Sequence, residues 1–567
     1  MNFEYFLPEA LNQSLQASVA DWNGNQKLQR LWAKDASLWT SEDEAKWLGW
    51  LDIVERQQAD IGSLKELARD VRSAGFKQCL LLGMGGSSLC PEVLALTYGS
   101  QPDMPALHIV DSTDPAQVAA ARNAVNLNET VCIVASKSGS TLEPNILKAY
   151  FFAEMVQAVG AEQAGSHFIA ITDPGSKMEQ VALEDKFRRI YYGDASIGGR
   201  FSALSKFGMV PAAVMGLDIE RFLASAAEGV GEARVTQVEQ NSAAMLGLIL
   251  GVAHNTGRDK ITFFTSPEIC DLGAWMEQLI AESTGKIGKG ITPVDREAIG
   301  SPEVYGDDRL FAYVRLKSGE NAALDAGVAA LVKAGQPVVR FDIEDTYDLP
   351  EQFFTWEFAV AVAGSVIGIN TFNQPDVEAA KIATRELTSE YEKTGRLAEP
   401  IPLVDSDGLK VFADEKYAAV LGQHPDAAGY IKAHLGQLRP HDYFAALAYI
   451  QMTGAHEQAI QGFRMRVRDS KRVATCLGFG PRFLHSTGQD YKGGPNTGVF
   501  LQITADHAMD VAIPGARYTF GVVIDAQAAG DLTVLEERGR RALRVHLGAD
   551  VAAGLQRLSD LVTAALA

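Results

Sequence analysis

Four hydroxyl groups and one lysine lie in one short loop, Ser136-Lys137-Ser138-Gly139-Ser140-Thr141, between an expected strand and an expected helix. Backbone N–H groups and the dipole at a helix N-terminus attract anions, and hydroxyl groups add donors for phosphate oxygens. A polar turn with one N-capping serine or threonine would need only one of these hydroxyls. The density of donors therefore predicts a phosphate site formed by Ser136, Ser138 and Thr141, with Lys137 adding positive charge.

A second polar loop precedes the first in the chain, Gly85-Gly86-Ser87-Ser88, and it also follows an expected strand. Glycine-rich turns are common at such positions, and the dinucleotide pattern GxGxxG is absent, so this loop alone indicates little. Ligands of open α/β sheets bind beyond the carboxyl ends of the strands. We therefore expect Gly86 and Ser87 to form a second wall of the same pocket.

An arginine follows two glycines in the stretch Ile197-Gly198-Gly199-Arg200-Phe201-Ser202. The glycines allow a close backbone approach, and the guanidinium group of Arg200 is suited to stabilise a negative charge that develops during a reaction. A surface turn with a solvated arginine would give the same pattern. The stretch by itself leaves both interpretations open.

Apolar residues at positions 272, 275, 276, 279 and 280 predict a helix over Leu272 to Thr284 with one apolar face. Gln278 and Glu282 are four residues apart and lie together on the edge of that face. Partial burial there would raise the pKa of the Glu282 carboxyl towards the range useful for a general base. The alternative is a boundary glutamate that pairs with Lys286.

The stretch Asn373-Gln374-Pro375-Asp376-Val377-Glu378-Ala379-Ala380-Lys381 predicts a late helix with Pro375 at its first position. Gln374 and Lys381 are seven residues apart, which places them two turns apart on one helix face. A lysine in such a place is most often a solvated surface residue.

Strands alternate with helices after about residue 75, which is the pattern of parallel sheets with crossover helices. The expected strands are Cys79–Met84, Leu107–Val110, Val131–Ala135, Phe168–Thr172, Ile261–Phe264, Leu310–Val314, Pro337–Phe341, Tyr443–Tyr449, Val473–Leu477, Val499–Ile503 and Leu543–His546. The fold class is therefore α/β. We expect a helical N-terminal segment (1–75), a first α/β domain (76–215), a helical connection (216–256), a second α/β domain (257–400) and an additional C-terminal α/β segment (401–567).

Composition excludes several classes of protein. Of the 567 residues, 47% are hydrophobic and 22% are charged, and the formal net charge is −20, which argues against a nucleic-acid or anionic membrane partner. No apolar run reaches the roughly 18 residues that cross a bilayer. The five cysteines include no CxxC pair, and the N-terminus lacks the features of a signal peptide, so we expect a cytoplasmic protein without a zinc site.

The serine-rich loop, the Gly-Gly-Arg stretch, the glutamate helix and the late helix follow one another over about residues 76 to 395. In this order they resemble the phosphoglucose isomerase family, whose members contain two sugar-isomerase (SIS) domains with α/β/α layers. The resemblance implies that the phosphate loop extends to Glu143 and that Gln278 and Glu282 lie on the catalytic helix. It also implies that the late helix contributes Gln374 and Lys381. Four ordered matches are specific, although each one alone is not.

One departure concerns the catalytic histidine. In the family it normally lies between the glutamate and the late lysine, but this chain has no histidine between Glu282 and Lys381. A stretch similar to the family's His-Ser-x-Gly-Gln occurs instead at His485-Ser486-Thr487-Gly488-Gln489. This tail resembles the isomerase half of bifunctional transaldolase–phosphoglucose isomerase proteins, although the transaldolase barrel itself is missing.

The resemblance implies an enzyme of glycolysis and gluconeogenesis that interconverts glucose 6-phosphate and fructose 6-phosphate without a metal or redox cofactor. Glu282 would move the proton between C2 and C1, Arg200 would stabilise the enediolate, and His485 or Lys381 would open the sugar ring. The expected partner is a small sugar phosphate. The family also suggests a homodimer with shared sites, unless His485 completes the site within one chain.

Two alternatives remain from the sequence. The first is another SIS isomerase, acting on mannose phosphate or an amino-sugar phosphate, because such proteins share the serine-rich loop. The second is a regulator that binds a sugar phosphate without converting it. A regulator would not need a carboxylate at Glu282.

Overall fold

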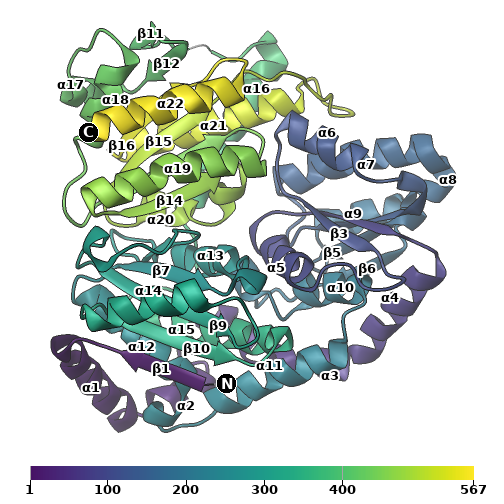
Figure 1. The fold of residues 1–567 in the computed structure, drawn as a ribbon. Helices are drawn as coiled ribbons and strands as arrows, with labels where there is room; N and C mark the ends of the chain where they lie inside the picture. The colour runs from purple at the N-terminus through teal and green to yellow at the C-terminus, as the bar shows by residue number, and fades with distance from the viewer. Residues whose placement is uncertain (1, 399) are drawn as a thin grey trace.

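The computed structural model describes residues 2–398 and 400–567, which form three β-sheets flanked by helices (Figure 1). Each sheet is mostly or entirely parallel, so the predicted α/β class is confirmed. The first sheet has the order β3-β2-β4-β5-β6. Its strands are β2 (Gln78–Leu82), β3 (Ala106–Val110), β4 (Thr130–Ala135), β5 (Phe168–Thr172) and β6 (Arg189–Tyr192), and its helices are α5 (Leu89–Tyr98), α6 (Pro115–Asn123), α7 (Leu142–Val159), α8 (Ala161–Ala164) and α9 (Lys177–Glu184).

Both faces of the first sheet are buried, since successive residues of a strand belong to different hydrophobic clusters. On β4, Val131 and Ile133 belong to the largest core, whereas Cys132 and Val134 pack on the other face. This burial on two sides explains why these strands have nearly continuous apolar sequences.

The second sheet has the order β1-β10-β9-β7-β8. Its strands are β1 (Asn2–Phe6), β7 (Lys260–Thr265), β8 (Thr292–Val294), β9 (Arg309–Leu316) and β10 (Val338–Ile343), and the helices around it include α13 (Leu272–Thr284), α14 (Ala322–Lys333) and α15 (Leu349–Ile367). The prediction of an entirely helical N-terminal segment is wrong for residues 2–6, because β1 pairs antiparallel with β10 at the sheet edge. Phe3 stacks on Phe341 of β10, with 4.7 Å between the ring centroids.

Helices from the N-terminal segment, from the end of the first predicted domain and from the predicted connection join the first two sheets. They are α1 (Glu9–Gly24), α2 (Lys27–Trp32), α3 (Ile53–Ala59), α4 (Ile61–Ser73), α10 (Lys206–Met215), α11 (Ile219–Ala233) and α12 (Ser242–Asn255). One continuous apolar core contains residues of these helices together with residues of both sheets. The sheets are thereby fixed relative to each other, which is a requirement for a site that uses both.

The third sheet belongs to the C-terminal segment and has the order β11-β12-β16-β15-β13-β14. Its strands are β11 (Val404–Ser406), β12 (Leu409–Phe412), β13 (Tyr443–Tyr449), β14 (Ala474–Phe479), β15 (Gly498–Thr504) and β16 (Arg541–His546), and the helices of this region are α17 (Glu415–Leu421), α18 (Ala427–Leu435), α19 (Gly454–Lys471), α20 (Gly488–Gly493), α21 (Phe520–Glu537) and α22 (Val551–Leu566). Helix α16 (Val377–Thr394), from the predicted second domain, packs against α21 of this region. β13 to β16 are parallel, and β11 and β12 extend the edge in antiparallel pairs.

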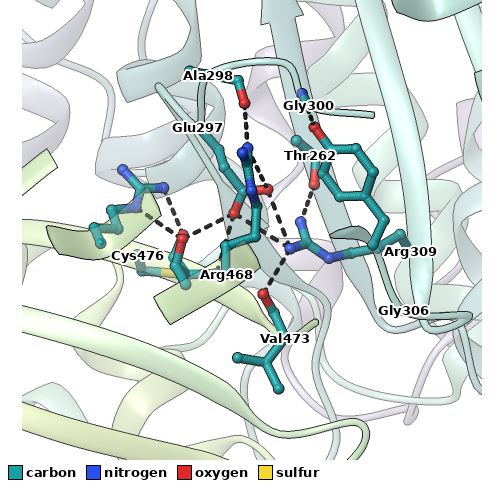
Figure 2. A network of polar contacts seen from close by, with 12 residues as sticks. Thr262, Glu297, Ala298, Gly300, Gly306, Arg309, Arg468, Val473 and Cys476 are labelled. Carbon is teal, nitrogen blue, oxygen red and sulfur yellow. Dashed lines mark hydrogen bonds and ion pairs between the residues drawn. The ribbon is translucent and has the colours of Figure 1, made fainter. Parts of the chain in front are cut away.

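A buried ion-pair network attaches the C-terminal segment to the second sheet (Figure 2). Glu297 lies 3.2 Å from Arg309 of β9 and also accepts a hydrogen bond of 2.9 Å from the hydroxyl group of Thr475 on β14. Arg309 donates to the carbonyl oxygen of Val473, and Arg468 of α19 donates to that of Ala298. The start of β14 is thereby fixed against the second sheet.

A second contact fixes the other end of β14 against the first sheet. Arg482 follows this strand and pairs with Glu92 of α5 and with Asp111 after β3. The C-terminal segment, green to yellow in Figure 1, therefore contacts both preceding sheet units, and the loop that follows β14 lies between them. In the part of the chain that the structure describes, no helix combines the length and apolarity needed to cross a membrane.

Candidate active site

Glu282 lies near the C-terminal end of α13, a helix that is buried on nearly all sides. Only 8% of Glu282 is exposed. Gln278 donates a hydrogen bond of 3.3 Å to the Glu282 carboxylate and a second one of 2.8 Å to the carbonyl oxygen of His485. The predicted proximity of Gln278 and Glu282 is thus observed, and Gln278 also links the helix to the C-terminal segment.

Burial raises the pKa of the Glu282 carboxyl above its ordinary value, and nearby cations oppose this rise. The Nη1 atom of Arg200 lies 3.6 Å from Glu282 Oε2. The alternative pairing with Lys286 is not observed, because the Lys286 ammonium donates to the carbonyl oxygens of Asn370 and Asn373. Glu282 is thus a desolvated carboxylate whose charge is only partly balanced, as a general base requires.

Arg200 is 1% exposed, so the interpretation as a solvated surface arginine is wrong. Its guanidinium group donates to Ser283 next to the base, to Gln374, and to the backbone oxygen of Thr371. These bonds hold the planar group in one orientation beside Glu282. Fixed positive charge at this place can stabilise an enediolate without reorganisation.

Two glycines allow the loops of the first sheet to approach one another. Gly85 has a φ of +55°, a conformation that favours glycine, and a Cβ atom at Gly86 would overlap the carbonyl group of Gly199. The turn after β2 therefore packs directly on the turn that carries Arg200. This contact requires glycine and places Ser87 beside the arginine loop.

The hydroxyl groups of the serine-rich loop are available to a ligand. Thr141 caps α7, yet in the described residues its side chain makes no capping hydrogen bond. Ser136 Oγ is buried and lacks a partner among the same residues, and Ser138 Oγ lies 2.7 Å from the Ser140 hydroxyl, within the loop itself. Lys137 lines the cavity as well, and its ammonium group pairs with Asp173 at 2.7 Å, which holds the loop in place.

His485 reaches the site from the short turn after β14. Its Nε2 atom lies 3.0 Å from Glu143 Oε1 at the start of α7. Burial raises the pKa of Glu143, but His485, a backbone hydrogen bond and Lys381 together outweigh this effect, so the pKa is lowered overall. Glu143 therefore remains ionised and can hold the imidazole ring in one orientation.

Gln374 and Lys381 differ in their local structure and contacts. The late helix, α16, begins at Val377, so Pro375 is not its first residue and Gln374 belongs to the preceding loop, where it accepts a hydrogen bond from Arg200. The Lys381 side chain is 43% exposed and lies 3.8 Å from Glu378. The predicted common helix face is wrong for Gln374.

The predicted site residues line two adjoining cavities. The larger, of about 390 Å³, is lined by Gly86, Ser87, Ser136, Lys137, Ser138, Thr141, Arg200, Gln278, Glu282, Gln374 and His485. The smaller, of about 230 Å³, contains Glu143 and Lys381 and shares Ser138, Thr141 and His485 with the larger. The phosphate loop and the base face one cavity, and His485 lies where the two meet.

Sequence reasoning missed several residues of this site. Trp47 of the N-terminal segment lines the larger cavity, and Gln527 of α21 lines the smaller one. Thr113, after β3, donates to Gln527. No local pattern marks these residues, because they approach the site from distant parts of the chain.

The charge around Glu282 suits an anionic substrate. Arg200, His485, Lys381 and Lys286 all lower its pKa through their positive charge. Among the described residues, no group of three or more His, Cys, Asp or Glu side chains could hold a metal ion. The arrangement can bind a phosphate at one end and transfer a proton at the other.

Comparisons with known proteins agree with this chemistry. The family profile described as phosphoglucose isomerase matches residues 52–304. A glucose-6-phosphate isomerase from Rubrobacter xylanophilus is 30% identical over 376 residues, which are 58% of this chain and 85% of the relative. A glucose-6-phosphate isomerase from a Synechococcus strain is 28% identical over 348 residues, which are 54% of this chain and 65% of the relative.

Two solved structures share the fold. A hypothetical protein from Thermus thermophilus aligns with a TM-score of 0.57 and 23% identity over 68% of this chain and 99% of that chain. A glucose-6-phosphate isomerase from Chlamydia trachomatis aligns with a TM-score of 0.52 and 21% identity over 63% of this chain and 76% of that chain.

Proposed function

Because the chain belongs to the phosphoglucose isomerase family, it interconverts glucose 6-phosphate and fructose 6-phosphate, and we propose that Glu282 is the base of this reaction. The observation that carries this proposal is the shared cavity. A buried carboxylate with a raised pKa, a fixed guanidinium group and a set of hydroxyl donors all line it. These are the groups that binding and proton transfer need.

Binding places the phosphate on the serine-rich loop. The hydroxyl groups of Ser136, Ser138 and Thr141 supply hydrogen bonds, together with backbone N–H groups at the start of α7 and the dipole of this helix. Ser87 adds a donor from the neighbouring turn. The sugar then extends towards Glu282.

Ring opening transfers a proton from the O1 hydroxyl group to the ring oxygen O5, and the C1–O5 bond breaks. His485 lies at the junction of the two cavities and carries out this transfer, with Lys381 nearby. An imidazole ring can both accept and donate a proton near neutral pH.

Proton transfer follows in the open chain. Glu282 removes the proton from C2, the electron pair forms the C1=C2 double bond, and O1 becomes negatively charged beside Arg200. The O2 hydroxyl proton passes to O1, Glu282 returns its proton to C1, and O2 becomes the carbonyl oxygen of fructose 6-phosphate. No electron is gained or lost overall.

An isotope experiment tests the proposal. Glucose 6-phosphate with deuterium at C2 is converted in ordinary water in the presence of a chelator. We expect part of the deuterium at C1 of the product and the rest in solvent, since a carboxyl that carries a proton exchanges it with water. Complete retention, together with full activity of Glu282→Gln, would indicate hydride transfer and would rule out Glu282 as the base.

Selectivity is measured in the same assay with mannose 6-phosphate as the substrate. Turnover of mannose 6-phosphate at the rate of glucose 6-phosphate would favour the broader SIS isomerase alternative. Binding of fructose 6-phosphate without turnover would favour the regulator. A regulator would not need the contact between Arg200 and Glu282.

We also propose that one chain holds a complete site in a reducing compartment. Glu282, Arg200 and the phosphate loop come from the first two sheet units, and His485 comes from the C-terminal segment of the same chain. The five cysteines are free thiols, four of them buried, which suits the cytoplasm.

A further inference from the structure

Gln527 is a buried glutamine at the edge of the smaller cavity, on α21 of the C-terminal segment, and 2% of it is exposed. Its Nε2 atom donates a hydrogen bond of 2.7 Å to Glu143 Oε1. Its Oε1 atom accepts a hydrogen bond of 2.6 Å from the hydroxyl group of Thr113, which is fully buried. Both ends of the amide are therefore occupied.

The direction of this hydrogen-bond chain is fixed by its donors. The Glu143 carboxylate needs a donor, so the amide nitrogen of Gln527 faces it, and the amide oxygen accepts from the Thr113 hydroxyl. An ionised Glu143 can only accept, and the same Oε1 atom also lies 3.0 Å from His485 Nε2. His485 must therefore carry a proton on Nε2, which leaves Nδ1 as the nitrogen that can exchange a proton with the sugar.

We propose that Gln527, held by Thr113, is a positioning residue for ring opening, because it fixes the Glu143 carboxylate that orients His485. This inference rests on the proposed role of His485. Gln527 acts on the imidazole ring through Glu143 and has no direct part in the proton transfer at Glu282.

A purely structural role would be to attach α21 to the first sheet unit. Apolar contacts already provide this attachment, since Phe520 and Val523 of α21 belong to the hydrophobic cluster on one face of the first sheet. The Phe520 ring also packs edge-on against Tyr150 of α7, with 5.9 Å between centroids. Docking of the helix therefore does not depend on the amide of Gln527.

Three substitutions test the proposal. Gln527→Leu removes the donor to Glu143 and keeps most of the side-chain volume. Thr113→Val removes the group that orients the amide. The control is Gln502→Leu, because Gln502 is a buried glutamine that bonds the backbone of the same helix at Ala528.

For Gln527→Leu we expect kcat on cyclic glucose 6-phosphate to fall roughly tenfold or more, which is less than the 10²–10⁴-fold effect of losing an acid–base group altogether. KM and the exchange of the C2 proton in an analogue that cannot close its ring should change little. Thr113→Val should also lower kcat on the cyclic sugar selectively, but by a smaller factor than Gln527→Leu. Gln502→Leu should show no such selectivity.

Gln527→Glu adds a readout that a structural role would not give. The introduced carboxyl can donate to Glu143 only while it is protonated, and burial beside a carboxylate raises its pKa. The other charged groups that line this cavity are His485, Lys381, Glu378 and Arg385. Turnover of the cyclic sugar should be near that of the wild type at low pH and fall as the introduced carboxyl ionises.

The ¹⁵N chemical shifts of the His485 ring, assigned with His485→Ala, show which nitrogen carries the proton. We expect Nε2 in the wild type and a mixture of both forms in Gln527→Leu. Unchanged shifts together with unchanged turnover of the cyclic sugar would overturn the inference. Changed shifts in Gln527→Leu, with no effect of His485→Ala on turnover, would confirm the positioning of the ring and overturn only the role in ring opening.

Discussion

Among the individual residues, Glu282 shows how burial and nearby charge act together. Burial raises the pKa of this carboxyl, and Arg200 is the cation that most strongly lowers it again. A carboxyl whose pKa lies between that of a fully desolvated and that of a solvated glutamate can both remove and return a proton. Substitution and pH dependence can each test this balance.

Glu282→Gln should bind substrate normally and lose turnover by roughly 10²–10⁴-fold, because the amide keeps the size and polarity of the side chain but cannot accept the C2 proton. Steady-state kinetics and the C2 exchange rate measure this loss. The matched control is Glu268→Gln, at an exposed glutamate that does not line the cavity. Activity of Glu282→Gln within a few-fold of the wild type would mean that another group is the base.

The pH dependence should reflect the raised pKa of Glu282. The base works only when it is deprotonated, so kcat/KM should fall on acidification at a higher pH than for a solvated glutamate. Lys381 lowers this pKa, and Lys381→Met should therefore move the acid limb to higher pH. If Lys381→Met leaves the acidic fall of kcat/KM at the same pH, or moves it to lower pH, this fall does not reflect ionisation of Glu282.

Ser138→Ala and Thr141→Ala should mainly raise KM, since contacts to the phosphate exist in the ground state and the transition state alike. Each lost charge-assisted hydrogen bond costs about 1.5–3 kcal/mol, or roughly a 10- to 100-fold rise in KM. Titration with inorganic phosphate checks binding directly. Phosphate that binds both variants as tightly as the wild type would place the phosphate group elsewhere.

Among the helices and strands, loops at the ends of strands bring the site residues together, and helix packing holds them there. The turns after β2 and β4 carry the hydroxyl groups, α13 carries the base, and the turn after β14 carries His485. The position of this last turn depends on β14, whose start is fixed by the Glu297 network (Figure 2). Substitutions in this network test how the C-terminal segment is attached.

Glu297→Gln should lower the free energy of unfolding by about 3–5 kcal/mol, because it leaves the buried Arg309 guanidinium group without its carboxylate. Adding Arg309→Met should recover most of the loss, since no unpaired charge then remains buried. Denaturant-induced unfolding measures both effects. Glu344→Gln, in an exposed pair with Lys317, should change stability by only about 0–1 kcal/mol.

Equal stability of Glu297→Gln and the wild type would mean that the network does not hold β14. A double variant that is less stable than the single one would show that the unpaired Arg309 charge is not the cause of the loss. Either result would contradict the argument that this ion pair fixes the strand preceding His485.

In the molecule as a whole, three sheet units meet at one site. The core that joins the first two sheets fixes the phosphate loop relative to Glu282, and the C-terminal segment contacts both units (Figure 1). Every residue assigned to the reaction comes from one chain. We have proposed above that one chain holds the complete site, and dilution of the protein tests this proposal.

Specific activity should therefore be constant when the protein is diluted from the micromolar to the nanomolar range. A site shared between two chains would lose activity as the chains separate, because their association depends on concentration. Activity and sedimentation measured at the same concentrations test this prediction. A loss of activity that coincides with dissociation would show that the partner supplies part of the site.

The chemistry of the site and most of the strands could be predicted from the sequence. Strand Phe168–Thr172 and helix Leu272–Thr284 were predicted with the bounds that the structure has, because their apolar patterns are local. The hydroxyl loop was predicted from its residue types, its spacing and the adjacent helix, whereas Glu282 was chosen over a boundary glutamate only through the resemblance to the family.

Contacts between distant residues could be found only in the tertiary structure. β1 joins the second sheet, Gln374 leaves the helix, Lys137 pairs with Asp173, and Thr113 reaches Gln527, and no local pattern indicates these contacts. They depend on long-range packing and on the competition of buried polar groups for partners, since most buried polar groups are hydrogen-bonded. The position of His485 beside Glu143 has the same origin, because it results from the docking of the C-terminal segment on the sheets that precede it.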